Sequence, residues 1–155
     1  EFNRYSYSEC NGYCGEANLT NAYLSNADLT NANLYRADLT DANLRSTDLK
    51  DASLTYAELT NAYLRFADLT NADLTEADLT NANLRSTDLT DAYLAYADLT
   101  GANLQYADLT NAVVEGSDLT DADFTSATVT NANFFYTTWS NTIWTDGVAY
   151  NSNQA

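Results

Sequence analysis

The sequence lacks several residue types on which common sites and folds depend. It has no proline, no histidine and no methionine, only five glycines and two cysteines, and six basic residues against 22 acidic ones. Because proline cannot donate a hydrogen bond to a sheet ladder, its absence fits a backbone that is paired along its whole length. Without histidine, two cysteines are too few ligands for a zinc site.

The excess of acidic residues gives a formal net charge of −16. Such a surface repels nucleic acid and anionic membranes, so we expect no direct nucleic-acid binding. No apolar run is long enough to span a bilayer, and no signal-peptide hydrophobic region is present, so we expect no membrane insertion. The chain begins at Glu1 instead of Met, which fits removal of an export leader as well as trimming. The compartment is left open, with an extracytoplasmic protein expected before a cytoplasmic one.

A period of five dominates the sequence. From Ala17 to Asn141 the motif Ala-Asp-Leu-Thr-Asn, found in full at residues 77–81, recurs with small substitutions and no insertion. On an α-helix, five-residue steps would carry the leucines around the cylinder and leave no buried stripe. On one straight strand, an odd period would place successive leucines on opposite faces, although the residues between them are polar.

The chain must therefore turn a corner in every repeat. In the motif at 77–81 we expect a four-residue extended piece with Ala77 and Leu79 pointing inward and the Asp and Thr pointing outward. Asn81 would then form the corner, since Asn, Asp and Ser tolerate tight-turn dihedrals. Repeated corners wind the chain into a coil, and stacked coils form an all-β solenoid.

Tandem Ala-(Asp/Asn)-Leu-x-x motifs resemble the pentapeptide repeat family, and the resemblance covers residues 17–141. It implies a right-handed quadrilateral β-helix with four pentapeptides per coil and about six coils, counted from the about 25 repeats in this range. We expect residues 1–16 to form an N-terminal cap, residues 17–141 to form the solenoid, and residues 142–155 to close the other end as a hairpin and tail. The hairpin is expected because Asp146-Gly147 is a common hairpin turn.

An acidic residue precedes the leucine in every second repeat. With four repeats per coil these residues form two ladders on opposite faces, Asp38, Glu58, Asp78, Asp98 and Asp118 on one and Asp28, Asp48, Asp68, Asp88 and Asp108 on the other. Carboxylates about 5 Å apart repel by roughly 1 kcal/mol in water, so something must offset or use this repulsion. One explanation is solubility. The resemblance implies another, because some family members are DNA mimics that bind gyrase or related type II topoisomerases.

Threonine follows the leucine on the same two faces. The columns are Thr20, Thr40, Thr60, Thr80, Thr100 and Thr120 on one face, and Thr30, Thr70, Thr90, Thr110 and Thr130 on the other, where Lys50 interrupts. Regular threonine columns resemble the surfaces of some ice-binding proteins. The neighbouring carboxylates disfavour an ice-like water layer, and the strand propensity of threonine explains the columns better.

Two further columns are candidates for surface contacts. Arg45, Arg65 and Arg85 each stand three residues before an aspartate, which predicts a strip of surface salt bridges. Tyr56, Tyr96 and Tyr136 share another column. Exposed tyrosines offer large amphipathic area at little entropic cost, so this column predicts a contact surface, with cross-coil packing as the alternative.

The two cysteines lie in the N-terminal segment, and two interpretations of them stay open. Cys14 is in register with the inward leucines, which predicts a small buried side chain. Alternatively, Cys10 and Cys14 form a short-loop disulfide, which would place the protein in an oxidising compartment.

No catalytic constellation is present, because the carboxylates are spaced along convex faces and do not converge in a cleft. One carboxylate per coil is also no calcium cage. We therefore expect no enzymatic activity, no cofactor and no metal. Our preferred hypothesis is a structural or protein-interaction module, a rigid acidic rod that contacts a protein partner or copies of itself, end to end or side by side. The DNA mimic is the alternative, and ice binding is the third.

Overall fold

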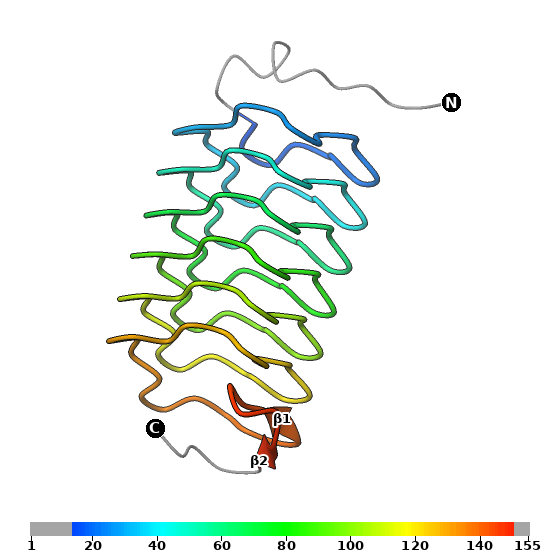
Figure 1. Ribbon diagram of the computed structural model, residues 1–155. Coiled ribbons are helices and arrows are strands. Elements are labelled where there is room, and N and C mark those ends of the chain that lie inside the picture. The colour runs from blue at the N-terminus through cyan, green and yellow to red at the C-terminus, as the bar shows by residue number, and fades with distance from the viewer. Residues whose placement is uncertain (1–13, 151–155) are drawn as a thin grey trace.

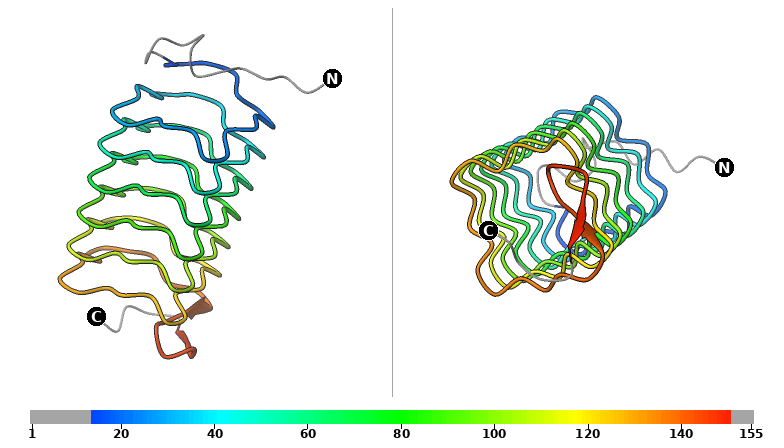
Figure 2. Two further views of the ribbon diagram at one scale, coloured as in Figure 1. Left: turned by 45° about the horizontal axis from the view of Figure 1, so that its top comes forward. Right: turned by 60° about the horizontal axis from the view of Figure 1, so that its bottom comes forward.

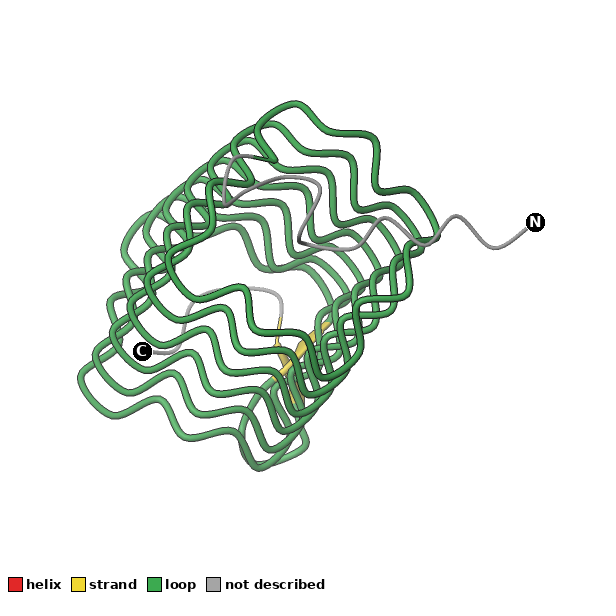
Figure 3. Ribbon diagram, turned by 90° about the horizontal axis from the view of Figure 1, so that it is seen from above, coloured by secondary structure: helices red, strands yellow, loops and turns green. Residues whose placement is uncertain are grey.

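The computed structural model describes residues 14–150, which form one stack of coils (Figure 1). Isolated parallel bridges join the residue before each leucine to the residue 20 positions further on, as in Asp38 to Glu58 and Asn43 to Tyr63. Each coil therefore takes 20 residues, or four repeats. Viewed along the stack, the coils superimpose into a four-sided outline (Figure 3). The fold is a right-handed quadrilateral β-helix, so the expected fold class is confirmed.

The repeat at 77–81 shows how one motif satisfies its own backbone. The N–H of Ala77 donates to Leu74 in its own coil, the N–H of Asp78 to the preceding coil, and those of Leu79 and Asn81 to the next coil. The fifth N–H, of Thr80, donates to the side chain of Asp78 at 2.9 Å. All five donors are paired, which removes the main penalty against burying such a backbone.

The corner is a two-residue turn formed by Thr80 and Asn81. The carbonyl of Leu79 accepts from the N–H of Ala82 at 2.9 Å, and only Asn81, with φ of 56°, has a positive φ within the turn. This combination matches a type II turn. The extended piece is therefore shorter than the four residues predicted, because this hydrogen bond draws Thr80 into the turn.

The corner position has a positive φ in residues other than Asn, Asp, Ser and Gly as well. It includes Arg36, Tyr56, Phe66, Tyr96, Tyr106 and Tyr136, with φ between 53° and 64°. Large side chains rarely adopt this conformation. Except at Tyr136, the N–H of each of these corner residues donates to the next coil, which holds the corner in place. The repeat pattern alone does not predict this strain.

The interior is a column of leucines lined by alanines, as predicted. Leu79 and its counterparts from Leu34 to Leu109 are almost fully buried, and each contributes about 1.5–3 kcal/mol. Four buried hydroxyl residues replace the alanine: Thr47, Thr87, Ser117 and Thr142, whose side chains donate to the carbonyls of Leu24, Leu64, Leu94 and Leu119 at 2.6–2.9 Å. Across residues 14–150, no buried side-chain nitrogen or oxygen lacks a hydrogen-bond partner.

The C-terminal end is closed by a hairpin. Strand β1 (Thr142–Ile143) pairs antiparallel with β2 (Ala149–Tyr150), so the predicted hairpin is confirmed. Figure 2 shows it within the outline of the last coils. Between the strands, the ring of Trp144 lies 4.7 Å from Trp139 and 5.1 Å from Phe134. These aromatic contacts replace the leucine column at the point where no further coil follows.

At the N-terminal end of the stack, Cys14 is the first residue that the structure describes. Cys14 is buried, 3% exposed, in register with the inward column, and it is disulfide-bonded. Cys10 lies outside the described residues, so its pairing with Cys14 stays a prediction. The N-terminal cap expected for residues 1–16 also lies almost entirely outside them.

Candidate interaction faces

Both acidic ladders are present as predicted. Parallel bridges run from Asp38 through Glu58, Asp78 and Asp98 to Asp118, and from Asp28 through Asp48, Asp68 and Asp88 to Asp108. We call these the Asp38 ladder and the Asp28 ladder. They lie half a coil apart and therefore on opposite faces of the rod.

The aspartates of the ladders close the turns that follow them. Each accepts a hydrogen bond from the backbone N–H two residues later, at 2.9–3.2 Å. Asparagine makes the same bond at Asn18, Asn33, Asn43, Asn83, Asn103 and Asn133, at 3.0–3.2 Å. Sequence reasoning missed this bond, although the strong preference for Asp or Asn before the leucine is its signal. The same turn forms after Tyr63, Tyr93 and Val113, whose side chains cannot make this bond, so the side-chain oxygen supports the turn without being essential to it. Either Asp or Asn supplies that oxygen, so the turn does not need a charge.

The threonine hydroxyls also donate to the ladder carboxylates. Thr20 and Thr60 reach the aspartate of the next coil, Asp38 and Asp78, at 2.8 and 3.0 Å. Others bond within their own repeat, as Thr120 does to Asp118 at 2.6 Å. These bonds support the packing interpretation of the threonine columns, since they direct hydroxyls to carboxylates.

These hydrogen bonds stabilise the charged form of the carboxylates. The backbone N–H of Thr40 and its hydroxyl, helped by the Thr20 hydroxyl, hold the pKa of Asp38 below its ordinary value. Burial works to raise the pKa of Asp78, but hydrogen bonds from Thr80 and the Thr60 hydroxyl outweigh it and lower the pKa. Asp38 and Asp78 therefore stay ionised at neutral pH, and these hydrogen bonds offset part of the repulsion between neighbouring carboxylates.

One ladder is partly neutralised and the other is not. The ammonium of Lys50 lies 2.8 Å from Asp68 and 3.2 Å from Asp48, both members of the Asp28 ladder. Hydrogen bonds to Asp68 and then Asp48 raise the pKa of Lys50. Among residues 14–150 these are the only salt bridges, so the Asp38 ladder has none.

The arginines do not form the salt-bridge strip that the sequence predicted. The guanidinium of Arg65 lies 4.4 Å from the Phe66 ring centre, that of Arg45 lies 5.6 Å from the same ring, and that of Arg85 lies 4.6 Å from Tyr106. The prediction is wrong because the aspartate three residues later lies around the corner, whereas the aromatic corner residue is adjacent. We call Arg45, Arg65 and Arg85 the arginine column.

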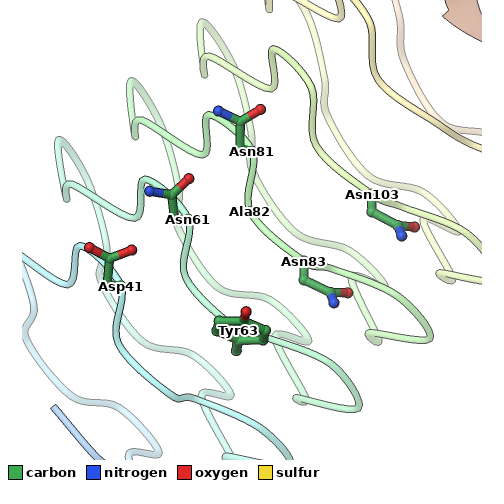
Figure 4. Close-up of a pocket in the computed structure, with 7 residues that line it drawn as sticks. All are labelled: Asp41, Asn61, Tyr63, Asn81, Ala82, Asn83 and Asn103. Carbon is green, nitrogen blue, oxygen red and sulfur yellow. The ribbon is translucent and has the colours of Figure 1, made fainter. Parts of the chain in front are cut away.

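The arginine column lies on a face that is built mainly from amides. Beside it run Asn43, Tyr63, Asn83 and Asn103, which take the position that the acidic residues occupy on the ladder faces. A shallow, open depression of about 410 Å³ lies here, lined by Asp41, Asn61, Tyr63, Asn81, Ala82, Asn83 and Asn103 (Figure 4). It gathers amides and one tyrosine, with Asp41 at its edge as the single charged group, and so lacks the paired acid and base of a hydrolytic site.

The three predicted contact tyrosines differ from one another. Tyr56 belongs to a packed cluster, because its hydroxyl donates to Glu76 at 2.9 Å and the Arg36 guanidinium lies 5.5 Å from its ring centre. Tyr96 covers Gly116, where a Cβ atom would lie 2.6 Å from the ring. Tyr136 is 87% exposed. Of the three, Tyr136 offers the most area for contact.

The described part of the chain contains no group of three or more cysteine, aspartate or glutamate residues that could hold a metal ion. Residues 14–150 also include no helix long and apolar enough to cross a membrane. The features that remain are flat faces of distinct chemistry: two acidic ladders and one face of amides and arginines.

Comparisons with known proteins agree with this architecture. A search of curated proteins finds no match. Among solved structures, the chain is similar to Rfr23, a pentapeptide repeat protein of the cyanobacterium Cyanothece 51142, with 25% identity and a TM-score of 0.67 over 88% of this chain and 93% of that one. It is also similar to a pentapeptide repeat protein of the Arabidopsis thaliana thylakoid lumen, with 25% identity and a TM-score of 0.52 over 68% and 70% of the two chains.

A third similar structure is HetL, a pentapeptide repeat protein involved in heterocyst differentiation regulation in Nostoc sp. strain PCC 7120. It is 28% identical, with a TM-score of 0.47 over 88% of this chain and 80% of that one. The family model described as pentapeptide repeats (8 copies) matches residues 17–55, 57–95 and 97–134, well over half of the sequence. The chain therefore belongs to the pentapeptide repeat family.

Proposed function

We propose that the protein is a non-catalytic interaction rod that binds a partner protein through its two acidic faces. One observation carries this proposal. Asparagine closes the turn as well as aspartate does, yet acidic residues fill ten successive ladder positions. In the two other columns at this position, only Asp73 and Asp123 are acidic. The concentration of charge on opposite faces exceeds what the turns require.

The chemistry of the ladders suits a partner with a basic surface. Ionised carboxylates recur once per coil, about 4.8 Å apart, on a backbone that is hydrogen-bonded at every coil. Binding to such a surface needs little ordering of the rod, and charge complementarity speeds encounter and excludes acidic partners.

The test uses a variant that removes charge and keeps the turn oxygen. In the ladder variant, Asp38, Asp78, Asp98 and Asp118 are changed to Asn. The matched corner variant changes Asp41, Asp51, Asp91 and Asp121 to Asn, which alters the formal charge by the same amount at the corners. Parent and variants are immobilised, exposed to an extract of the source cells, and the retained proteins are identified by mass spectrometry.

We expect the parent and the corner variant to retain the same basic proteins and to release them at high salt. We expect the ladder variant, in which one of the two acidic faces loses most of its charge, to retain them more weakly. Retention of one identical set by all three proteins would contradict the proposal. Loss from both variants would assign binding to net charge and not to the ladders.

A narrower function, DNA mimicry, is the second candidate. Two ladders on opposite sides of a straight rod present regularly spaced negative charge in the manner of phosphates. This function predicts that the parent inhibits supercoiling by DNA gyrase, or protects the enzyme, in a salt-sensitive way. Equal effects of the parent and the ladder variant would remove the argument for mimicry.

A further inference from the structure

The arginine column is a cationic strip on a strongly acidic rod. Arg45 and Arg65 are exposed and Arg85 is half-buried, and each is held beside an aromatic ring. None of the three takes part in a salt bridge. Stacking on a ring leaves the N–H edges of Arg45 and Arg65 available for a carboxylate, whereas Arg85 already donates one N–H to the side-chain oxygen of Gln105 and keeps its other N–H groups.

The spacing of this column equals the spacing of the acidic ladders. Arg45, Arg65 and Arg85 lie 20 residues apart, as do the members of each ladder, so both patterns repeat once per coil, about every 4.8 Å. When two copies lie side by side, every arginine of one can meet a carboxylate of the other without a drift in register. A partner whose charged groups repeat at a different spacing would fall out of register with the arginine column after a few contacts.

The two ladders are not equivalent as receiving surfaces. In the Asp28 ladder, Lys50 already binds Asp48 and Asp68. The Asp38 ladder has no basic residue among its members or in the threonine column that follows them, Thr20 to Thr120. Its carboxylates are therefore the better complement to a second copy's arginines.

We propose that copies of this protein associate side by side, with the arginine column of one copy docked on the Asp38 ladder of the next. This inference rests on the proposed interaction role, since it uses one of the two acidic faces. The two surfaces are different parts of the chain, so the contact is heterologous and leaves a free arginine column and a free ladder on each pair. Assembly therefore continues beyond two copies as the concentration rises.

The net charge sets the conditions for this association. Repulsion between two chains of charge −16 acts over long distances, whereas the ion pairs act in contact. At an ionic strength of about 0.15 M the Debye length is about 8 Å, which screens much of the repulsion and leaves close pairs less affected. We expect association to be strongest near this ionic strength, weaker at low salt, and lost near about 1 M.

The experiment is analytical ultracentrifugation of the whole chain over a concentration series at these ionic strengths. The column variant changes Arg45, Arg65 and Arg85 to Gln. Its control changes Asn31, Asn71 and Asn131 to Asp, which gives the same net charge and leaves the column intact. We expect the column variant to associate about tenfold or more weakly than the control.

A mixture provides the decisive result. The column variant keeps its ladder, and the ladder variant keeps its arginines, so each should be monomeric alone. Mixed together they should form a one-to-one pair and nothing larger. A parent that stays monomeric at every concentration and ionic strength would overturn the inference, as would a mixture with no pair. Neither result would affect the extract comparison, in which retention of one identical set of proteins by the parent and both variants is the failure specific to the proposed function.

Discussion

The acidic faces and the amide face of this rod make the same turn with different chemistry. On the acidic face, Asp78 accepts the N–H of Thr80, and on the amide face Asn83 accepts the N–H of Arg85. The bonds differ by 0.3 Å in length, and both lie beside fully buried leucines, Leu79 and Leu84. Asp and Asn are therefore interchangeable as the acceptor at this position, so the turn does not determine the charge of the side chain.

This difference separates two kinds of constraint on one sequence position. A short side chain with an acceptor supports the turn, which explains why Asp and Asn are common at this position, although Tyr63, Tyr93 and Val113 also occupy it. The segregation of Asp onto two columns requires another cause. The surfaces that this segregation creates, acidic ladders and an arginine column, are the part of the molecule through which we propose that it acts.

The largest expected effect comes from removing the shared oxygen. Asp78→Ala leaves the Thr80 N–H and the Thr60 hydroxyl without their acceptor, and we expect it to lower the free energy of unfolding by about 1–3 kcal/mol. Asn83→Ala removes one such bond and should cost about 0.5–1.5 kcal/mol. Denaturant unfolding gives both values. If Asp78→Ala were as stable as Asp78→Asn, the acceptor would have no role in the turn.

Acidification should distinguish the two kinds of face. The folded pKa of Asp38 and of Asp78 lies below the ordinary value of 3.8, so their contribution to stability is present above about pH 4 and is lost as pH falls through the folded values. Asparagine does not titrate. Thermal unfolding followed by circular dichroism should therefore show a smaller loss of Tm below about pH 4 in the ladder variant than in the parent. Parallel losses in the two proteins would contradict this assignment.

The smallest effect concerns the one ladder that holds a cation. Lys50→Thr restores the usual threonine and removes the bridge between Asp48 and Asp68, whose side chains are 40% and 31% exposed. Because exposed ion pairs stabilise weakly, we expect Tm to fall by about 1–2 °C at low salt, with no change near 1 M. The converse substitution, Thr90→Lys, should raise Tm by a similar amount. A salt-independent change would assign the effect to packing.

Much of the architecture could be predicted from the sequence because the repeat is so regular. The inward Leu and Ala, the corner at Asn81 and the two ladders all follow from a period of five with one buried side. The period does not report local hydrogen bonds, so the turn-closing role of Asp78 and the inclusion of Thr80 in the turn were missed. The hairpin at Asp146-Gly147 was found because its turn chemistry is independent of the repeat.

The side-chain contacts of the surface could not be predicted in the same way. The sequence analysis predicted salt bridges between each arginine and the aspartate three residues later. In the structure, the corner places Arg65 beside Phe66 and away from Asp68. The tyrosine column was treated as uniform, whereas its neighbours in adjacent coils make Tyr56 a packed residue and leave Tyr136 exposed. Such contacts depend on which residues stack above and below, which a one-dimensional pattern shows only after the coil length is known.

The most direct test of this account is the free energy of unfolding of the ladder variant, measured by denaturant at neutral pH beside the parent. If Asn is as good an acceptor as Asp in the turn, the four substitutions to Asn keep every backbone bond and remove carboxylate repulsion, so the variant should be as stable as the parent or more stable. A variant that is clearly less stable than the parent would show that the charges belong to the fold, and the argument that the ladders exist for binding would fail.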